Sequence, residues 1–194
     1  IIDGSGASLS RSQLLEIFLK ICDAVAYAHA EGVVHLDLKP ANIHINRHDE
    51  VHVLDWGLAK ISDIDMDEQK SLLDSTAFLS ADLDHNTLFG QVKGTPGYMS
   101  PEQAGGVFSS KDKRSDIYSL GAILYAILYH KPPIEADSLK SAIDRTIKGH
   151  IDKPPHKACL SLHAITFKAL SCAPAQRYQH VAEMINDINS YRLG

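Results

Sequence analysis

The chain has 194 residues, of which 44% are hydrophobic and 22% charged, and its formal net charge at pH 7 is −5. These values are ordinary for one soluble globular domain, and together with the lack of a basic stripe they argue against a disordered chain and against a nucleic-acid-binding protein. The three cysteines, Cys22, Cys159 and Cys172, lie far apart with no CxxC pair, which excludes a disulfide framework and predicts a reducing, cytoplasmic location.

The first predicted element is a helix that follows a small, flexible opening segment. Ser10 and Gln13 have the spacing of a capping box, in which a serine and a glutamine three residues later satisfy free backbone N–H groups at the start of a helix. Apolar residues then recur at helical spacing until Gly32, which predicts the end of the helix. Short extended segments follow at 33–34, 43–45 and 51–54, and the last two are predicted to form a β-hairpin.

The stretch 62–89 is polar, acidic and serine-rich, and its lack of periodicity predicts an irregular segment with a functional role. Beyond Gly90 the pattern is mainly helical, with candidate helices at 116–129, 138–148, 160–170 and 179–191. The longest apolar run, 120–129, is too short to span a bilayer, so no membrane segment is expected. The predicted fold class is α+β and mainly helical, with one small β-hairpin.

Two short motifs carry the residue types needed for phosphoryl transfer. The first reads His35-Leu-Asp-Leu-Lys-Pro-Ala-Asn42, and the second, Asp55-Trp-Gly57, follows an apolar strand 13 residues after Asn42. Carboxylate and amide oxygens are the ligands that Mg²⁺ prefers, an attacking hydroxyl needs a proton acceptor, and a moving phosphoryl group needs a cation.

These motifs resemble the catalytic loop H-R-D-x-x-x-x-N and the metal-binding turn D-F-G of the protein kinase family. Further matches follow in the family's order: Gly94-Thr-Pro-Gly-Tyr-Met-Ser-Pro-Glu102 resembles its substrate loop, and Ser115 to Gly121 resembles the start of its central helix. Lysine two residues after the aspartate resembles the serine/threonine branch. The chain is therefore identified as similar to the carboxy-terminal lobe of a bacterial eukaryotic-like serine/threonine kinase, with residues 55–102 as a long activation segment.

The resemblance implies a role for each residue of the motifs. Asp37 would orient the substrate hydroxyl and accept its proton, and Lys39 would stabilise the charge of the transferred phosphoryl group. Asn42 and Asp55 would hold Mg²⁺, and Thr95 would connect the substrate loop to Asp37 and Lys39. The implied cofactors are Mg²⁺ and ATP, and the implied partner is a protein substrate with a serine or threonine acceptor.

Five further residues have structural roles by the same resemblance. Asp116 would anchor the backbone of the loop that carries Asp37, and Glu102 and Arg177 would form a buried ion pair, which is costly to break. His35 and Trp56 would stack on each other, a reading that differs little from ordinary core packing.

Two substitutions depart from the family pattern. Leu36 stands where the motif has arginine, and because leucine cannot bind a phosphate, control by a phosphorylated activation segment is not expected at this position. His44 stands at the nucleotide floor, where relatives place leucine beneath the adenine ring, and some apolar contact is expected to be lost.

A third departure concerns the lobe that binds ATP. Only 34 residues precede His35, and they contain neither the motif G-x-G-x-x-G nor a lysine on a predicted strand. We therefore expect residues 1–194 to be a carboxy-terminal lobe that is inactive alone, with ATP bound through an amino-terminal lobe outside this chain. We also expect self-association, or rearrangement of 55–102, because an apolar surface would be uncovered. That surface comprises His35, Ile43, His44 and Trp56.

Two hypotheses of different classes remain open at this stage: an active kinase parent, and a kinase-like scaffold that binds partners without catalysis. Two weaker patterns resemble metal sites, and each lacks a required feature. Asp63, Asp65, Asp67 and Asp74 imitate part of a calcium loop but lack its glycine, and His44, His48 and His52 lie around one hairpin without a further zinc ligand at suitable spacing.

Overall fold

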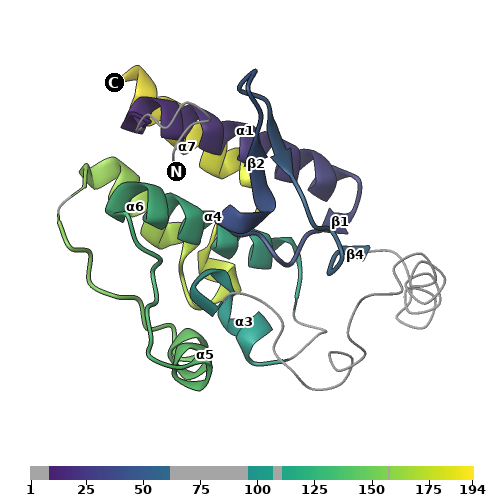
Figure 1. Ribbon diagram of the computed structural model, residues 1–194, viewed down its shortest axis with the longest axis vertical. Helices are drawn as coiled ribbons and strands as arrows, with labels where there is room; N and C mark the ends of the chain where they lie inside the picture. The colour runs from purple at the N-terminus through teal and green to yellow at the C-terminus, as the bar shows by residue number, and fades with distance from the viewer. Residues whose placement is uncertain (1–8, 62–95, 107–110, 157) are drawn as a thin grey trace.

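The computed structural model describes residues 9–61, 96–106, 111–156 and 158–194 (Figure 1). Its helices are α1 (Arg11–Ala30), α3 (Pro101–Ala104), α4 (Lys113–Tyr129), α5 (Leu139–Ile147), α6 (Leu160–Ala169) and α7 (Val181–Leu193). Its strands are β1 (Val33–Val34), β2 (Ile43–Ile45), β3 (Val51–Val53) and β4 (Lys60–Ile61). Single turns of 3₁₀-helix occur at η1 (Pro40–Asn42), η3 (Pro96–Tyr98) and η5 (Pro174–Gln176).

Helix α4 is the centre of the hydrophobic core. It is buried on nearly all sides and contacts α1 and α6, while α7 packs against both α1 and α6 (Figure 1). The absence of a side chain at Gly121 permits the close approach of α4 and α6, since a Cβ atom there would lie 2.7 Å from the Cβ of Ala169. A helix surrounded in this way explains the unbroken apolar run of its sequence.

Two small antiparallel pairs complete the fold. The hairpin of β2 and β3 pairs Ile43 with Val53, His44 with His52 and Ile45 with Val51. Strand β1 pairs with β4, which places residues 60–61 beside the segment that leaves α1. The predicted mainly helical fold with a small hairpin is confirmed.

Several boundaries differ from the prediction. Helix α4 begins at Lys113 instead of residue 116, because the Asp112 side chain accepts a hydrogen bond from the backbone N–H of Arg114 and caps the helix. Helix α7 begins at Val181 instead of residue 179, because His180 has extended backbone angles. The short elements α3 and β4 were not predicted. Among the described residues, none of the helices is both long enough and apolar enough to cross a bilayer.

Candidate active site

The 35–42 loop brings three of the predicted site residues into direct contact. The chain turns out of α1 at Gly32, whose φ of 75° is favourable only for glycine, and enters the loop through β1. Lys39 Nζ lies 2.7 Å from Asp37 Oδ2. Asn42 Nδ2 donates to the same carboxylate oxygen at 3.1 Å and to the backbone carbonyl of Asp37 at 2.8 Å. A carboxylate, an ammonium group and a primary amide therefore converge on one point.

Asp55 is placed beside this cluster through the backbone of Leu54. The N–H of Leu54 donates to the carbonyl of Asn42 at 2.8 Å, and the carbonyl of Leu54 lies 3.0 Å from His35 Nε2. Asp55 is the next residue, exposed and with a φ of 61°. Trp56 lies against His35 with 4.5 Å between ring centroids, and its indole N–H donates to Val53. The two motifs are thus held together by main-chain contacts.

Asp116 lies beneath the loop and anchors its backbone. The fully buried carboxylate accepts hydrogen bonds from the N–H groups of His35 and Leu36, both at 2.8 Å. His29 Nε2 lies 2.8 Å from the same carboxylate. Sequence reasoning assigned Asp116 this position but missed His29, because a histidine near the end of a helix carries no signal of its partner.

Leu36 adopts a left-handed conformation with a φ of 63°. For a residue with a Cβ atom this conformation costs roughly 1–2 kcal/mol, and it persists only where the surroundings hold it. Two side chains do so here: Asp116 accepts from the N–H of Leu36, and Gln103 Nε2 donates to its carbonyl at 2.6 Å. Gln103 was not predicted as a site residue, although its Ser-x-x-Gln spacing with Ser100 is visible in the sequence.

Glu102 and Arg177 form a bidentate ion pair, with nitrogen–oxygen distances of 2.7 and 2.8 Å. The Arg177 side chain is fully buried and also donates to the backbone carbonyls of Ser171, Cys172 and Arg114. Burial alone would raise the pKa of the Glu102 carboxyl, but the hydrogen bonds and charge of Arg177, together with a bond from Ser115, lower it below its ordinary value. The pair joins α3 to the segment before α7.

Residues 2–187 match the family model described as the protein kinase domain. The chain belongs to the protein kinase family. It is 40% identical over 186 residues to the serine/threonine-protein kinase PknD of Protochlamydia amoebophila, covering 93% of this chain and 18% of that protein. It is also 37% identical over 179 residues to the serine/threonine-protein kinase PknB of Mycobacterium leprae, covering 91% of this chain and 26% of that protein. The chain thus spans about a fifth to a quarter of the length of these relatives.

Some of the other predicted site residues lie outside the described residues, and His44 lies on the surface. Thr95, the acidic stretch 62–89 and the calcium-like aspartates lie outside the described residues. His44 is exposed on the hairpin opposite His52, with 6.4 Å between ring centroids, and the described part of the chain contains no group of three or more His, Cys, Asp or Glu side chains suited to a metal.

One expectation about the surface needs correction. His35 was expected in an exposed apolar surface but is fully buried, because Trp56 and the backbone of Leu54 cover it. Trp56 was expected to stack on His35 and to belong to the uncovered surface; its ring centroid lies 4.5 Å from that of His35, and 37% of its surface is exposed. The exposed apolar side chains of this region are Leu54 and Trp56.

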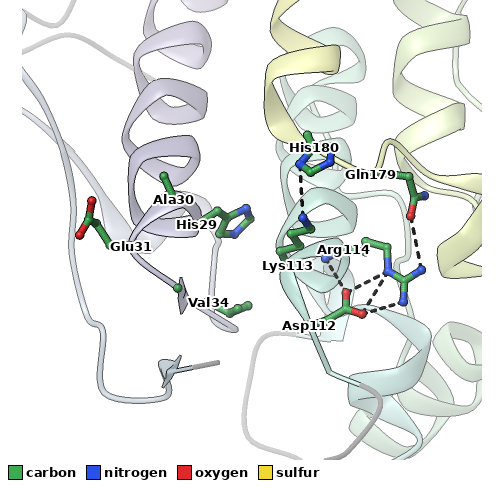
Figure 2. Close-up of a pocket in the computed structure, with 10 residues that line it drawn as sticks. His29, Ala30, Glu31, Val34, Asp112, Lys113, Arg114, Gln179 and His180 are labelled. Atoms are coloured by element: carbon green, nitrogen blue, oxygen red, sulfur yellow. Dashed lines mark hydrogen bonds and ion pairs between the residues drawn. The ribbon is translucent and has the colours of Figure 1, made fainter. Parts of the chain in front are cut away.

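A hollow in the described part of the chain is lined in part by residues that precede the loop and does not include Asp37. It has a volume of about 720 Å³ and lies between the end of α1 and the starts of α4 and α7 (Figure 2). Arg114 pairs with Asp112 at 2.6 Å, and Lys113 Nζ lies 3.3 Å from His180 Nδ1, so the cations at this hollow already have partners. Figure 2 shows these pairs on one side and His29 on the other. The convergent polar cluster of the 35–42 loop therefore remains the candidate active site of the kinase domain.

Proposed function

We propose that this chain supplies the catalytic face of a serine/threonine kinase whose parent protein transfers the γ-phosphoryl group of ATP to serine or threonine hydroxyls of proteins. The observation that carries the proposal is the convergence of Asp37, Lys39 and Asn42, with Asp55 held beside them through Leu54. Fold alone does not determine chemistry, but this set of groups in a kinase-family chain is suited to phosphoryl transfer.

In the proposed mechanism, Asp37 accepts the proton of the substrate hydroxyl as its oxygen forms a bond to the γ-phosphorus. The bond from that phosphorus to the bridging oxygen breaks, and ADP leaves. Lys39, whose ammonium group already lies 2.7 Å from Asp37 Oδ2, stabilises charge on the moving phosphoryl group and orients the carboxylate.

The residues present fit a magnesium ion. Asn42 uses its Nδ2 for both hydrogen bonds to Asp37, so those bonds leave its amide oxygen, a hard ligand, for a metal. Asp55 offers an exposed carboxylate on the neighbouring segment. When bound, Mg²⁺ would neutralise phosphate charge. We propose that ATP is held jointly with an amino-terminal lobe of the parent protein, and that residues 55–102 form its activation segment.

The test compares phosphoryl transfer by the parent protein with that of Asp37→Asn and Asp55→Asn. The rate of phosphoryl transfer should fall roughly 100-fold or more in each variant, since removal of a positioned general base or metal ligand has effects of that size. Asp49→Asn is the matched control, because Asp49 has nearly the same backbone φ of 58° but lies exposed in the hairpin turn. Full activity in either site variant would contradict the proposal.

A partner-binding scaffold is the second candidate. It is favoured by Leu36, an almost fully buried apolar side chain at the position where the kinase motif has arginine. A parent protein that folds, yet neither binds Mg·ATP nor phosphorylates itself or a protein, would support the scaffold over the enzyme.

A further inference from the structure

We infer that Gln103 is a positioning residue for Asp37, and that it links the backbone of the 35–42 loop to the 98–100 segment. The inference rests on the kinase function proposed above and assigns a role to a side chain outside the motif residues. Gln103 lies in α3 with 7% of its surface exposed, 67 residues from its partner Leu36.

The first step is the backbone of Leu36, which immediately precedes Asp37. A left-handed conformation is unfavourable for leucine, so the peptide groups on both sides of it must be fixed by their surroundings. Asp116 fixes the N–H and Gln103 fixes the carbonyl, and both hydrogen bonds are buried. If the bond from Gln103 is removed, the peptide group between Leu36 and Asp37 keeps only the contact of the Asp37 N–H with His35 Nδ1 at 3.2 Å, so the backbone that carries Asp37 is held less firmly.

The second step is that only a primary amide of this length can make the contacts. Gln103 Oε1 accepts from the backbone N–H of Ser100 at 3.2 Å and from its hydroxyl at 3.0 Å, while Nε2 donates to Leu36. The orientation of the amide is fixed by its partners, because a backbone N–H can only donate and a carbonyl can only accept. A carboxylate at this position would still accept from the N–H and hydroxyl of Ser100, but it could not donate to the carbonyl of Leu36.

The third step is the coupling to the neighbouring segment. Ser119 Oγ donates to the carbonyl of Tyr98 at 2.8 Å, which fixes the chain just before Ser100 on α4. A small hollow of about 10 Å³ is lined by residues of both this segment and the 35–42 loop, so the two lie against each other. A displacement of Ser100 would therefore be transmitted through the amide of Gln103 to the carbonyl of Leu36.

The chain contains its own control for this inference. Ser10 and Gln13 at the start of α1 have the same Ser-x-x-Gln spacing, and Gln13 Oε1 accepts from the N–H of Ser10 at 2.9 Å. Gln13 is exposed and lies on a surface helix start. Glutamate can replace glutamine in a capping box, so Gln→Glu preserves the cap at both positions and removes an amide donor that matters only at Gln103.

The experiment measures steady-state kinetics and backbone hydrogen exchange in the parent protein and its variants Gln103→Glu and Gln13→Glu. For Gln103→Glu we expect kcat to fall at least tenfold with KM for ATP changed less than twofold. Exchange of the amides in 35–37 should accelerate at least tenfold, with α7 unchanged. Gln13→Glu should match the wild type in both measurements.

A second variant covers the case in which a buried carboxylate prevents folding. Gln103→Met has similar length and no charge, and the same loss of kcat and faster exchange are expected. Unchanged kcat and unchanged exchange in a folded Gln103 variant would overturn the inference. If the wild-type parent shows no phosphoryl transfer, the proposed function fails instead, and the exchange measurement still decides whether Gln103 holds the loop.

Discussion

The two sides of the 35–42 loop differ in exposure and in how their polar groups are satisfied. On the open side, Lys39 retains 20% side-chain exposure and Asp55 is exposed. Beneath the loop, Asp116 is fully buried, and so is the Arg177 side chain, which bonds to Glu102 in α3; each makes three or more polar contacts. The open side presents groups that a ligand can reach, and the underside holds groups whose partners are all protein.

Because the two sides differ in burial, we expect them to respond differently to mutation. A buried charge that loses its partner incurs the full cost of desolvation, whereas an exposed charge is compensated by water. Substitutions beneath the loop should therefore lower both stability and activity, and substitutions on the open side should lower activity alone. The predictions below test that separation.

The largest expected effect on stability is that of Arg177→Met, which strands Glu102. We expect the free energy of unfolding to fall by about 3–5 kcal/mol, the range for breaking a buried ion pair by removing one partner. Urea denaturation measures this. Lys148→Met removes an exposed pair with Asp144 and should cost less than about 0.5 kcal/mol. A loss below about 1 kcal/mol for Arg177→Met would show that the underside is not held by this pair.

A smaller effect should appear in acid. The pKa of Glu102 is lowered in the folded protein, so its carboxylate contributes stability above the ordinary value of 4.5, and that contribution is lost as the pH falls through the folded pKa. Wild type should therefore lose more stability than Glu102→Gln between pH 7 and pH 3, and the two denaturation midpoints should approach each other. Parallel curves for the two proteins would contradict this sign.

The sequence predicted the central helix and the hairpin, because each has a local pattern. The apolar run of α4 and the alternation around β2 and β3 follow directly from burial. The pairing of β1 with β4 could not be predicted, since a two-residue strand has no periodicity and its paired residues lie 26 and 28 positions away.

For the candidate site, the sequence supplied the residues but not their connections. Asp37, Lys39 and Asn42 are close in the chain, so their convergence needed only one loop. Gln103 lies 67 residues from its partner Leu36 in that loop, and His29 lies 87 residues from its partner Asp116, so no local sequence pattern indicates either contact. The strained φ of Leu36 also has no sequence signal, because leucine is a residue that avoids it.

Only a small effect on stability is expected for Asp55→Gly, which tests the open side. Asp55 has a φ of 61°, where glycine is free of the steric cost that a Cβ atom brings, although glycine also gains freedom in the unfolded chain. These effects oppose each other, so we expect a change within about 1 kcal/mol together with a loss of phosphoryl transfer in the parent protein. Asp49→Gly, at a φ of 58° in the hairpin turn, should show the same small change with activity retained. A much larger loss of stability for Asp55→Gly than for Asp49→Gly would mean that the Asp55 carboxylate also holds the fold, and the separation between the two sides of the loop would then fail at this residue.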